Sequence, residues 1–174
     1  MKRLLFILLS LLCIASSCFA TPANHVCVAV YAMSGYDSLD VSDNWYTDTY
    51  NQIAKELSIH GIQSRNASEV WSDFVISRNR MGKVFTKDEV KQAYTDFRKD
   101  RFDHIIQFKT DKFVSYPQTN TCDVAVTMTV KNAKDYDGEP LLVYKDSAFY
   151  RPASEREAIL SSMIKDMISC YVHS

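Results

Sequence analysis

The segment Val26 to Met33, "VCVAVYAM", constrains the fold more than any other stretch, because it is apolar on both sides of a strand. Successive side chains of an extended chain point to opposite faces. One face receives Val26, Val28 and Val30, and the other receives Cys27, Ala29, Tyr31 and Met33. A strand that is apolar on both faces has to be covered on both. The segment therefore predicts a central strand of a sheet with other elements packed on each side.

The apolar period changes to that of a helix over residues 43–58. The aligned side chains are Tyr46, Tyr50, Ile53 and Leu57. Ser42 or Asp43 is the predicted N-cap, and Gly61 ends the helix before a short strand.

Two more helices are predicted between residues 66 and 99. Ser68 is the predicted cap of a short helix, and Asn66, in the sequon "NAS", is interpreted as helix-capping chemistry rather than a glycosylation site. Thr86 and Glu89 in "TKDE" form a capping box. The helix that they open carries Val90, Tyr94 and Phe97 on one face.

The rest of the chain predicts three strands and a closing helix. A strand covers His104 to Lys112, and residues 122–131 alternate between an apolar face and a wet or lightly covered face. Asp137-Gly138 predicts the turn into a partner strand over residues 141–150. Ser154 and Glu157 predict a second capping box at the start of the last helix.

These elements give the order β-α-β-α-α-β-β-β-α, which predicts an α/β fold. Its mixed sheet starts parallel and continues as an antiparallel meander, with helices packed on the sheet. The chain has 174 residues, of which 47% are hydrophobic and only four are glycine, so one globular domain is expected over residues 21–174.

Residues 1–20, "MKRLLFILLSLLCIASSCFA", have the basic start, short apolar run and small-residue end of a signal peptide. Cleavage after Ala20 predicts a soluble exported protein, which we expect in the periplasm or, alternatively, secreted. The alternative is a lipid on Cys18, which would make the protein an outer-membrane lipoprotein.

The charge and the cysteines limit the partners and the chemistry. Loss of Lys2 and Arg3 with the signal leaves 18 basic residues against 21 acidic ones, which argues against nucleic acid or an anionic lipid surface as the main partner. The mature chain keeps Cys27, Cys122 and Cys170, whose spacing suits no zinc site. One disulfide is expected, and the predicted topology favours Cys27–Cys170 because the last helix finishes near the start of the first strand.

The loop after the first strand carries one glycine, Gly35, and three aspartates, Asp37, Asp40 and Asp43. A phosphate site needs several glycines, and a calcium site needs a fuller ligand set. Gly35 is therefore interpreted as a turn residue and the aspartates as helix-capping groups. The four histidines belong to no catalytic motif, so no enzyme, cofactor or metal is expected; His104, at the start of a core strand, would be the first to test.

Aromatic rings beside carboxylates are the remaining candidate site. If the first and third strands are parallel neighbours, two groups of such residues meet at one end of the sheet. The predicted partner-binding residues are Tyr36, Asp37, Asp40, Trp45, Phe113 and Tyr116. The alternative is that these rings complete the core, for which Tyr46 in particular is spaced.

Several stretches resemble a group of bacterial envelope domains: "VCVAVYAMSGYDSLD", "IAKELSIHGIQ", "FDHIIQFKTDKF" and "CDVAVTMTVKNAKDYDGEPLLVYKDSAFY". The group includes the penicillin-binding-protein activator lipoproteins, the periplasmic domain of the curli-secretion channel and the amino-terminal domain of the Tol-system periplasmic protein. The resemblance implies a non-catalytic accessory protein that binds another envelope protein. The alternative is an exported immunity or inhibitor protein whose acidic loop mimics a substrate. The oligomeric state stays open.

Overall fold

The computed structural model describes residues 26–37, 44–79, 82 and 84–174. The strands are β1 (Cys27–Asp37), β2 (Gln63–Asn66), β3 (His104–Tyr116), β4 (Thr121–Asn132) and β5 (Leu142–Pro152). The helices are α2 (Trp45–Ile59), α3 (Ala67–Asn79), α4 (Lys87–Lys99) and α5 (Arg156–Val172). The predicted element order is confirmed.

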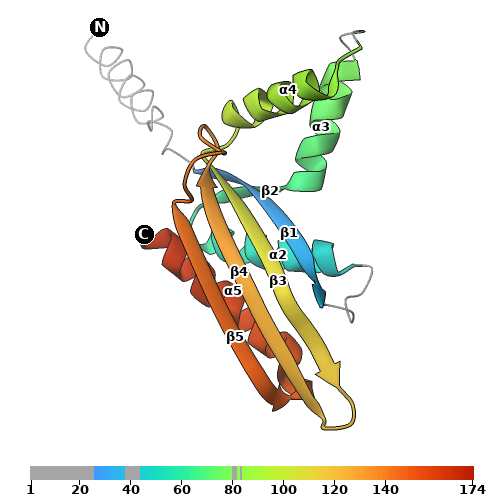
Figure 1. The fold of residues 1–174 in the computed structure, drawn as a ribbon. Coiled ribbons are helices and arrows are strands. Elements are labelled where there is room, and N and C mark those ends of the chain that lie inside the picture. The colour runs from blue at the N-terminus through green and yellow to red at the C-terminus, as the bar shows by residue number, and fades with distance from the viewer. Residues whose placement is uncertain (1–25, 38–43, 80–81, 83) are drawn as a thin grey trace, which may run out of the picture.

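The strands form one sheet in the order β2-β1-β3-β4-β5. β1 is parallel to both β2 and β3, and Val28 is aligned with Ser64 on one side and with His104 on the other. β3, β4 and β5 then pair antiparallel. The predicted parallel start and antiparallel meander are confirmed, and Figure 1 shows the three long strands continuing beyond the end of β1.

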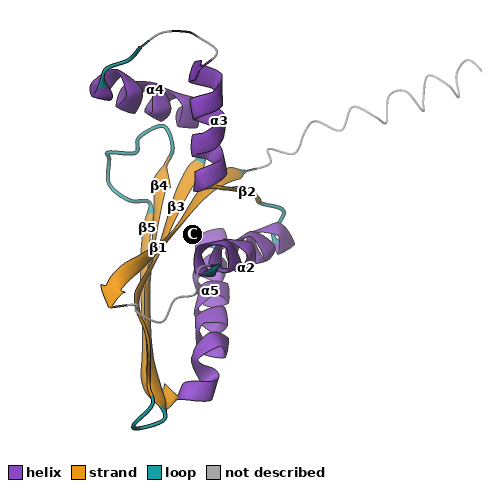
Figure 2. Ribbon diagram, turned by 90° about the vertical axis from the view of Figure 1, so that its right-hand side faces the viewer, coloured by secondary structure: helices purple, strands orange, loops and turns teal. Residues whose placement is uncertain are grey.

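Helices α2 and α5 cover one face of the sheet, and the main core lies between them and the strands (Figure 2). The alternation of β4 decides which side chains enter this core, because Val124, Val126, Met128 and Val130 are all buried. The largest buried side chains of this layer are Ile53, Leu57, Ile106, Phe108, Phe113, Leu160, Ile164, Met167 and Ile168.

The opposite face of the sheet is covered at one end only, by α3 and α4. A second cluster forms there around Ala29, Val70, Phe102, Ile105 and Ala133. Farther along, the same face carries polar side chains such as Thr127, which donates a hydrogen bond to Asp111 Oδ2 at 2.6 Å. The predictions that β1 is covered on both sides and β4 on one are therefore confirmed.

The first turn of α2 differs from its prediction. Trp45, Thr49, Ile53 and Leu57 are buried, whereas Tyr46 is 46% exposed. The prediction that Tyr46 faces the core is wrong, because burying the larger Trp45 ring turns its neighbour away and the Tyr46 hydroxyl bonds Ser34 Oγ at 2.7 Å. The predicted caps Ser42 and Asp43 lie outside the described residues.

The other helix starts give mixed results. Asn66 Oδ1 accepts a hydrogen bond from the Ser68 backbone N–H at 3.0 Å and α3 begins at Ala67, so Asn66 is a cap and the prediction for Ser68 is wrong. The Thr86–Glu89 capping box is confirmed. The Ser154–Glu157 box is wrong, because residues 153–155 form a 3₁₀ turn after Pro152 and the α-helix starts only at Arg156.

Gly35 lies inside β1 rather than in a turn. The β1–β3 register shifts between Ser34 and Asp37, and the β3–β4 register shifts between Thr110 and Lys112, so two irregularities lie side by side. A Cβ atom at Gly35 would lie 3.0 Å from the Thr110 carbonyl oxygen. Glycine therefore allows the close approach of the two strands here, and a larger residue would push the Thr110 carbonyl away by a few tenths of an ångström.

The connection between β4 and β5 spans residues 133–141. Gly138 donates its backbone N–H to the Asp135 carbonyl at 3.3 Å, so the predicted Asp137-Gly138 turn lies within a longer connection than a two-residue hairpin. None of the described helices is both long and apolar enough to cross a bilayer.

The three cysteines Cys27, Cys122 and Cys170 are free thiols, so the structure does not show the predicted Cys27–Cys170 disulfide. Tyr171, next to Cys170, bonds His104, so the two cysteines do lie near the same end of the sheet. However, Cys27 packs with the α3–α4 cluster, whereas α5 covers the other face. The sheet itself therefore separates the two sulfur atoms.

Alkylation of the unreduced protein should label Cys170, which is exposed, and leave buried Cys122 unmodified. Burial raises the pKa of both the Cys27 and the Cys122 thiols, and Asp103 raises that of Cys27 further, so both should react slowly. Mass spectrometry of the peptides measures the labelling. A Cys27–Cys170 linked peptide in an unreduced digest would contradict this arrangement.

Candidate aromatic binding surfaces

The structure brings two of the predicted partner-binding rings together, but inside the protein. Trp45 is 5% exposed and Phe113 is 2% exposed, and both belong to the main core. The Arg156 guanidinium lies over the Phe113 ring at 4.3 Å from its centroid. These two rings complete the core, as the alternative interpretation had it, and they are not an exposed patch.

The other predicted partner-binding residues do not form one group with Trp45 and Phe113. Tyr36 and Asp37 belong to β1, where the Asp37 backbone is aligned with Lys112. The side chains of Tyr36 and Asp37, and the whole of Asp40, lie outside the residues that the structure describes. Tyr116 is half-buried and bonds Asp123, on the opposite face of the sheet from Phe113. The inhibitor hypothesis depended on the acidic loop, of which residues 38–43 are not described.

Tyr116 belongs to a group of rings at one end of the sheet that we call the aromatic tip. Its members are Tyr116, Phe149 and Tyr150. Phe149 is 46% exposed and Tyr150 is 82% exposed. They lie where β3 and β5 end and β4 begins, near the 117–120 turn shown at the bottom of Figure 1. Tyr116 and Tyr150 line a hollow of about 470 Å³ with Gln118, Thr119, Thr121 and Asp123.

The backbone at Tyr150 is strained. Its φ of 56° lies in the left-handed region, which a tyrosine rarely adopts. The β4–β5 register shifts at this level, between Cys122 and Val124, and the Tyr150 backbone N–H donates to Asp123 Oδ1 at 3.0 Å. A buried carboxylate therefore holds the strained residue in place.

Asp123 is 5% exposed and is held by three donors. Besides Tyr150, its Oδ2 accepts a hydrogen bond from the Tyr116 hydroxyl at 3.2 Å and an ion pair from Lys112 Nζ at 3.5 Å. Burial alone would raise the pKa of Asp123, but these three donors outweigh it and the net pKa is lowered. Asp123 is thus ionised at neutral pH and fixes two of the three tip residues.

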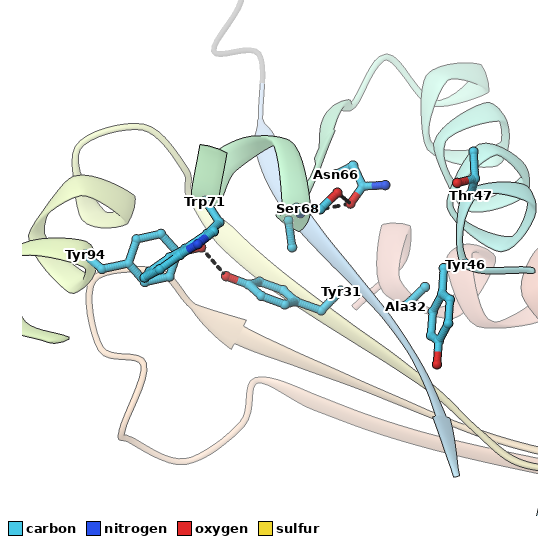
Figure 3. Close-up of a pocket in the computed structure, with 9 residues that line it drawn as sticks. Tyr31, Ala32, Tyr46, Thr47, Asn66, Ser68, Trp71 and Tyr94 are labelled. Carbon is cyan, nitrogen blue, oxygen red and sulfur yellow. Dashed lines mark hydrogen bonds between the residues drawn. The ribbon is translucent and has the colours of Figure 1, made fainter. Parts of the chain in front are cut away.

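A second aromatic surface, the aromatic pocket, is a cavity of about 450 Å³ (Figure 3). Its ring-bearing residues are Tyr31 from β1, Tyr46 from α2, Trp71 from α3 and Tyr94 from α4, and the other lining residues are Ala32, Thr47, Asn66, Ala67 and Ser68. None of these nine side chains carries a formal charge.

The rings at the α4 end of the aromatic pocket are fixed to one another. The Tyr31 and Tyr94 hydroxyls are 2.9 Å apart, and the Trp71 and Tyr94 rings meet edge to face with centroids 4.9 Å apart. Burial, then the hydrogen bond from Tyr31, raises the pKa of Tyr94 well above its ordinary value, so its hydroxyl stays neutral. Arg98 stacks on the Tyr94 ring at 4.7 Å from its centroid.

The aromatic pocket was missed because its rings come from four elements. Tyr94 is predicted as a helix-face residue and Tyr31 as a strand-face residue, and each is spaced for burial. No period in the sequence shows that residues 63 positions apart share a hydrogen bond. Parallel pairing of β2 with β1, which places the start of α3 beside Tyr31, is what assembles them.

His104, the histidine that would be tested first, lies against Tyr171 of α5. His104 Nδ1 lies 2.6 Å from the Tyr171 hydroxyl, and the two rings meet edge to face. Burial, with Asp103 nearby, raises the pKa of Tyr171 to about 12. Within the described ranges no three His, Cys, Asp or Glu side chains gather as metal ligands.

The sequence matches no protein-family model and no curated protein. Solved structures with a similar fold include the PelC dodecamer from Paraburkholderia phytofirmans, at 11% identity and a TM-score of 0.54, covering 83% of this chain and 85% of that chain. Lipoprotein GNA1162 from Neisseria meningitidis matches at 12% identity and a TM-score of 0.50, covering 86% of this chain and 98% of that chain. Protein XCC0632 from Xanthomonas campestris matches at 7% identity and a TM-score of 0.52, covering 84% and 83% of the two chains. At these identities the likeness is one of fold alone.

Proposed function

We propose that this protein is a non-catalytic accessory component of a bacterial envelope that binds another envelope protein through the aromatic tip. The observation that carries the proposal is Tyr150, a ring that is 82% exposed on a left-handed backbone held by buried Asp123. Strain of this kind persists only where the surroundings enforce it, and it clusters at binding sites.

The composition of the aromatic tip supports a protein partner. Tyrosine is enriched among residues that dominate binding energy, and it supplies a large contact area at a small entropy cost. Lys112 Nζ lies 5.5 Å from the Phe149 ring centroid, which adds a cation–π contact to the support of the tip. The envelope setting rests on the signal-type residues 1–20 and on the fold shared with a lipoprotein.

The test is capture of the partner from envelope extract with tagged full-length protein. A double variant, Phe149→Ala with Tyr150→Asn, removes both exposed rings, and asparagine tolerates the left-handed backbone at position 150. We expect recovery of the specific partner to fall by about tenfold or more, as for loss of two central binding residues.

Val143→Ala is the matched control, because Val143 is also exposed on β5 but lies far from the aromatic tip. Its capture should equal that of the wild type. Equal recovery of the same protein by wild type and double variant would overturn the tip as the binding surface.

A further inference from the structure

We propose that the aromatic pocket binds a ring of an uncharged glycan. The ligand class follows from three properties of the cavity: fixed aromatic walls, neutral hydrogen-bonding groups and the absence of charge among its lining residues. The pocket lies at the edge of β1 just beyond the end of β2, between α2 on one face of the sheet and α3 and α4 on the other. The aromatic tip lies at the far ends of β3, β4 and β5. The proposal is therefore independent of the protein partner proposed above.

The aromatic rings that line the pocket are partly exposed and ordered, so they can stack against a flat apolar face of a ligand. Trp71 is 45% exposed and, with half-exposed Tyr46, presents ring area to an incoming ligand. Tyr31 and Tyr94 are held by their shared hydrogen bond, and Tyr46 is held by its bond to Ser34 Oγ. Because the rings are already ordered, a ligand would lose little affinity to arranging them.

The polar groups are of the kind that bind hydroxyls. Asn66 Oδ1 is occupied by Ser68, which leaves the amide N–H₂ without a protein partner among the described residues. Thr47 Oγ1 likewise bonds no described side chain or backbone group, and Figure 3 shows the Asn66 amide nitrogen pointing toward the α2 side, where Thr47 lies. An amide and a hydroxyl can exchange hydrogen bonds with neighbouring hydroxyl groups of a sugar.

Two described arginines beside the pocket lining already have partners. Arg98 stacks on Tyr94 and Tyr136, and Arg65 pairs with Asp73 at 2.8 Å. A charged ligand would give up hydration without gaining an opposite charge from the lining. A purely apolar side chain of a protein partner would leave Asn66 and Thr47 without partners, which costs binding energy. A pyranose ring offers an apolar C–H face and hydroxyls at its edge, so it satisfies both parts of the site.

The size is also suitable, since about 450 Å³ lies within the range of roughly 300–1,000 Å³ that is typical of small-molecule sites. Planar apolar ligands without hydroxyls would use the rings but not the amide. Neutral saccharides are therefore the class that the lining selects.

The experiment uses the full-length protein, whose two tryptophans lie one in the core and one in the pocket. Maltohexaose, cellohexaose and the fully N-acetylated chitohexaose are titrated by tryptophan fluorescence and by calorimetry, with hexagalacturonate and the glucosamine hexamer as charged counterparts. We expect saturable binding of at least one neutral hexasaccharide, about tenfold or more tighter than either charged one.

Variants locate the site. Trp71→Ala should weaken saccharide binding by about tenfold or more, and Trp71→Phe should recover part of it, since a ring face remains. Thr47→Val, which removes a hydroxyl at constant volume, should weaken it less. Ile76→Ala is the control, because Ile76 is exposed on the same helix and does not line the pocket.

Three results would overturn the proposal: no saturable binding of any neutral hexasaccharide at millimolar concentrations, tighter binding of a charged hexasaccharide, or wild-type saccharide affinity in Trp71→Ala. The Phe149→Ala, Tyr150→Asn protein should keep its saccharide affinity. Loss of partner capture with intact saccharide binding, or the reverse, thus separates failure of one proposal from failure of the other.

Discussion

Phe113→Ala is expected to lower the free energy of unfolding by about 3–5 kcal/mol, the usual cost of removing a buried aromatic ring. The ring is 2% exposed, packs in the main core with Trp45 and carries the Arg156 guanidinium on its face. Its loss would leave a cavity. It would also remove the ring face on which the partly buried Arg156 guanidinium stacks. Urea unfolding followed by circular dichroism measures the change.

Phe149→Ala provides the matched comparison, since it removes the same ring from the same end of the sheet at an exposed position. Its effect on stability should stay within about 0.5 kcal/mol. If Phe113→Ala unfolded at the wild-type urea concentration, the ring would have to be a surface group, as the predicted partner-binding patch required.

Asp123→Ala is expected to cost about 2 kcal/mol at neutral pH, because it leaves the Tyr150 N–H and the Tyr116 hydroxyl without their shared acceptor. The carboxylate has a lowered pKa in the folded protein, so its stabilisation is present above the pKa of the unfolded chain, about 3.9, and is lost as the pH falls through the folded pKa. The difference between wild type and variant should therefore be full at neutral pH and shrink below about pH 4.

Urea unfolding at neutral pH and at a series of acidic pH values measures this difference. Asp137→Asn, at an exposed position of the β4–β5 connection, should show neither the loss nor its pH dependence. A difference between wild type and Asp123→Ala that stays constant into the acidic range would contradict the role of the ionised carboxylate.

The architecture was predictable because each element carries a strong local signal. The two-sided apolar strand from Val26, the alternation in residues 122–131 and the Thr86–Glu89 capping box each specify one structure. Together they fix an element order for which few sheet topologies exist. The parallel and antiparallel pairings followed from that order.

The aromatic pocket and the aromatic tip were not predictable because they depend on which face of a helix or strand each side chain takes and on register shifts in the strands. Trp45 and Tyr46 are adjacent, and only packing decides which of them turns inward. Cys27 and Cys170 lie near the same end of the sheet, as the topology predicts, but on opposite faces of it, and element order alone does not assign a face. The register shifts at Gly35 and near Tyr150, which shape the far end of the sheet, leave no periodic trace in the sequence.

The free edges of the sheet are unequal. Among the described residues, the β2 side offers a stepped edge, made of the four residues of β2 and then residues 31–37 of β1, whereas β5 offers one continuous edge of eleven residues. Growth of a fibril by strand addition needs a long edge on both sides of each molecule, because every added copy must present a fresh template. Here two copies that joined along β5 would use up both continuous edges, and only the stepped edges would be left for further strand pairing.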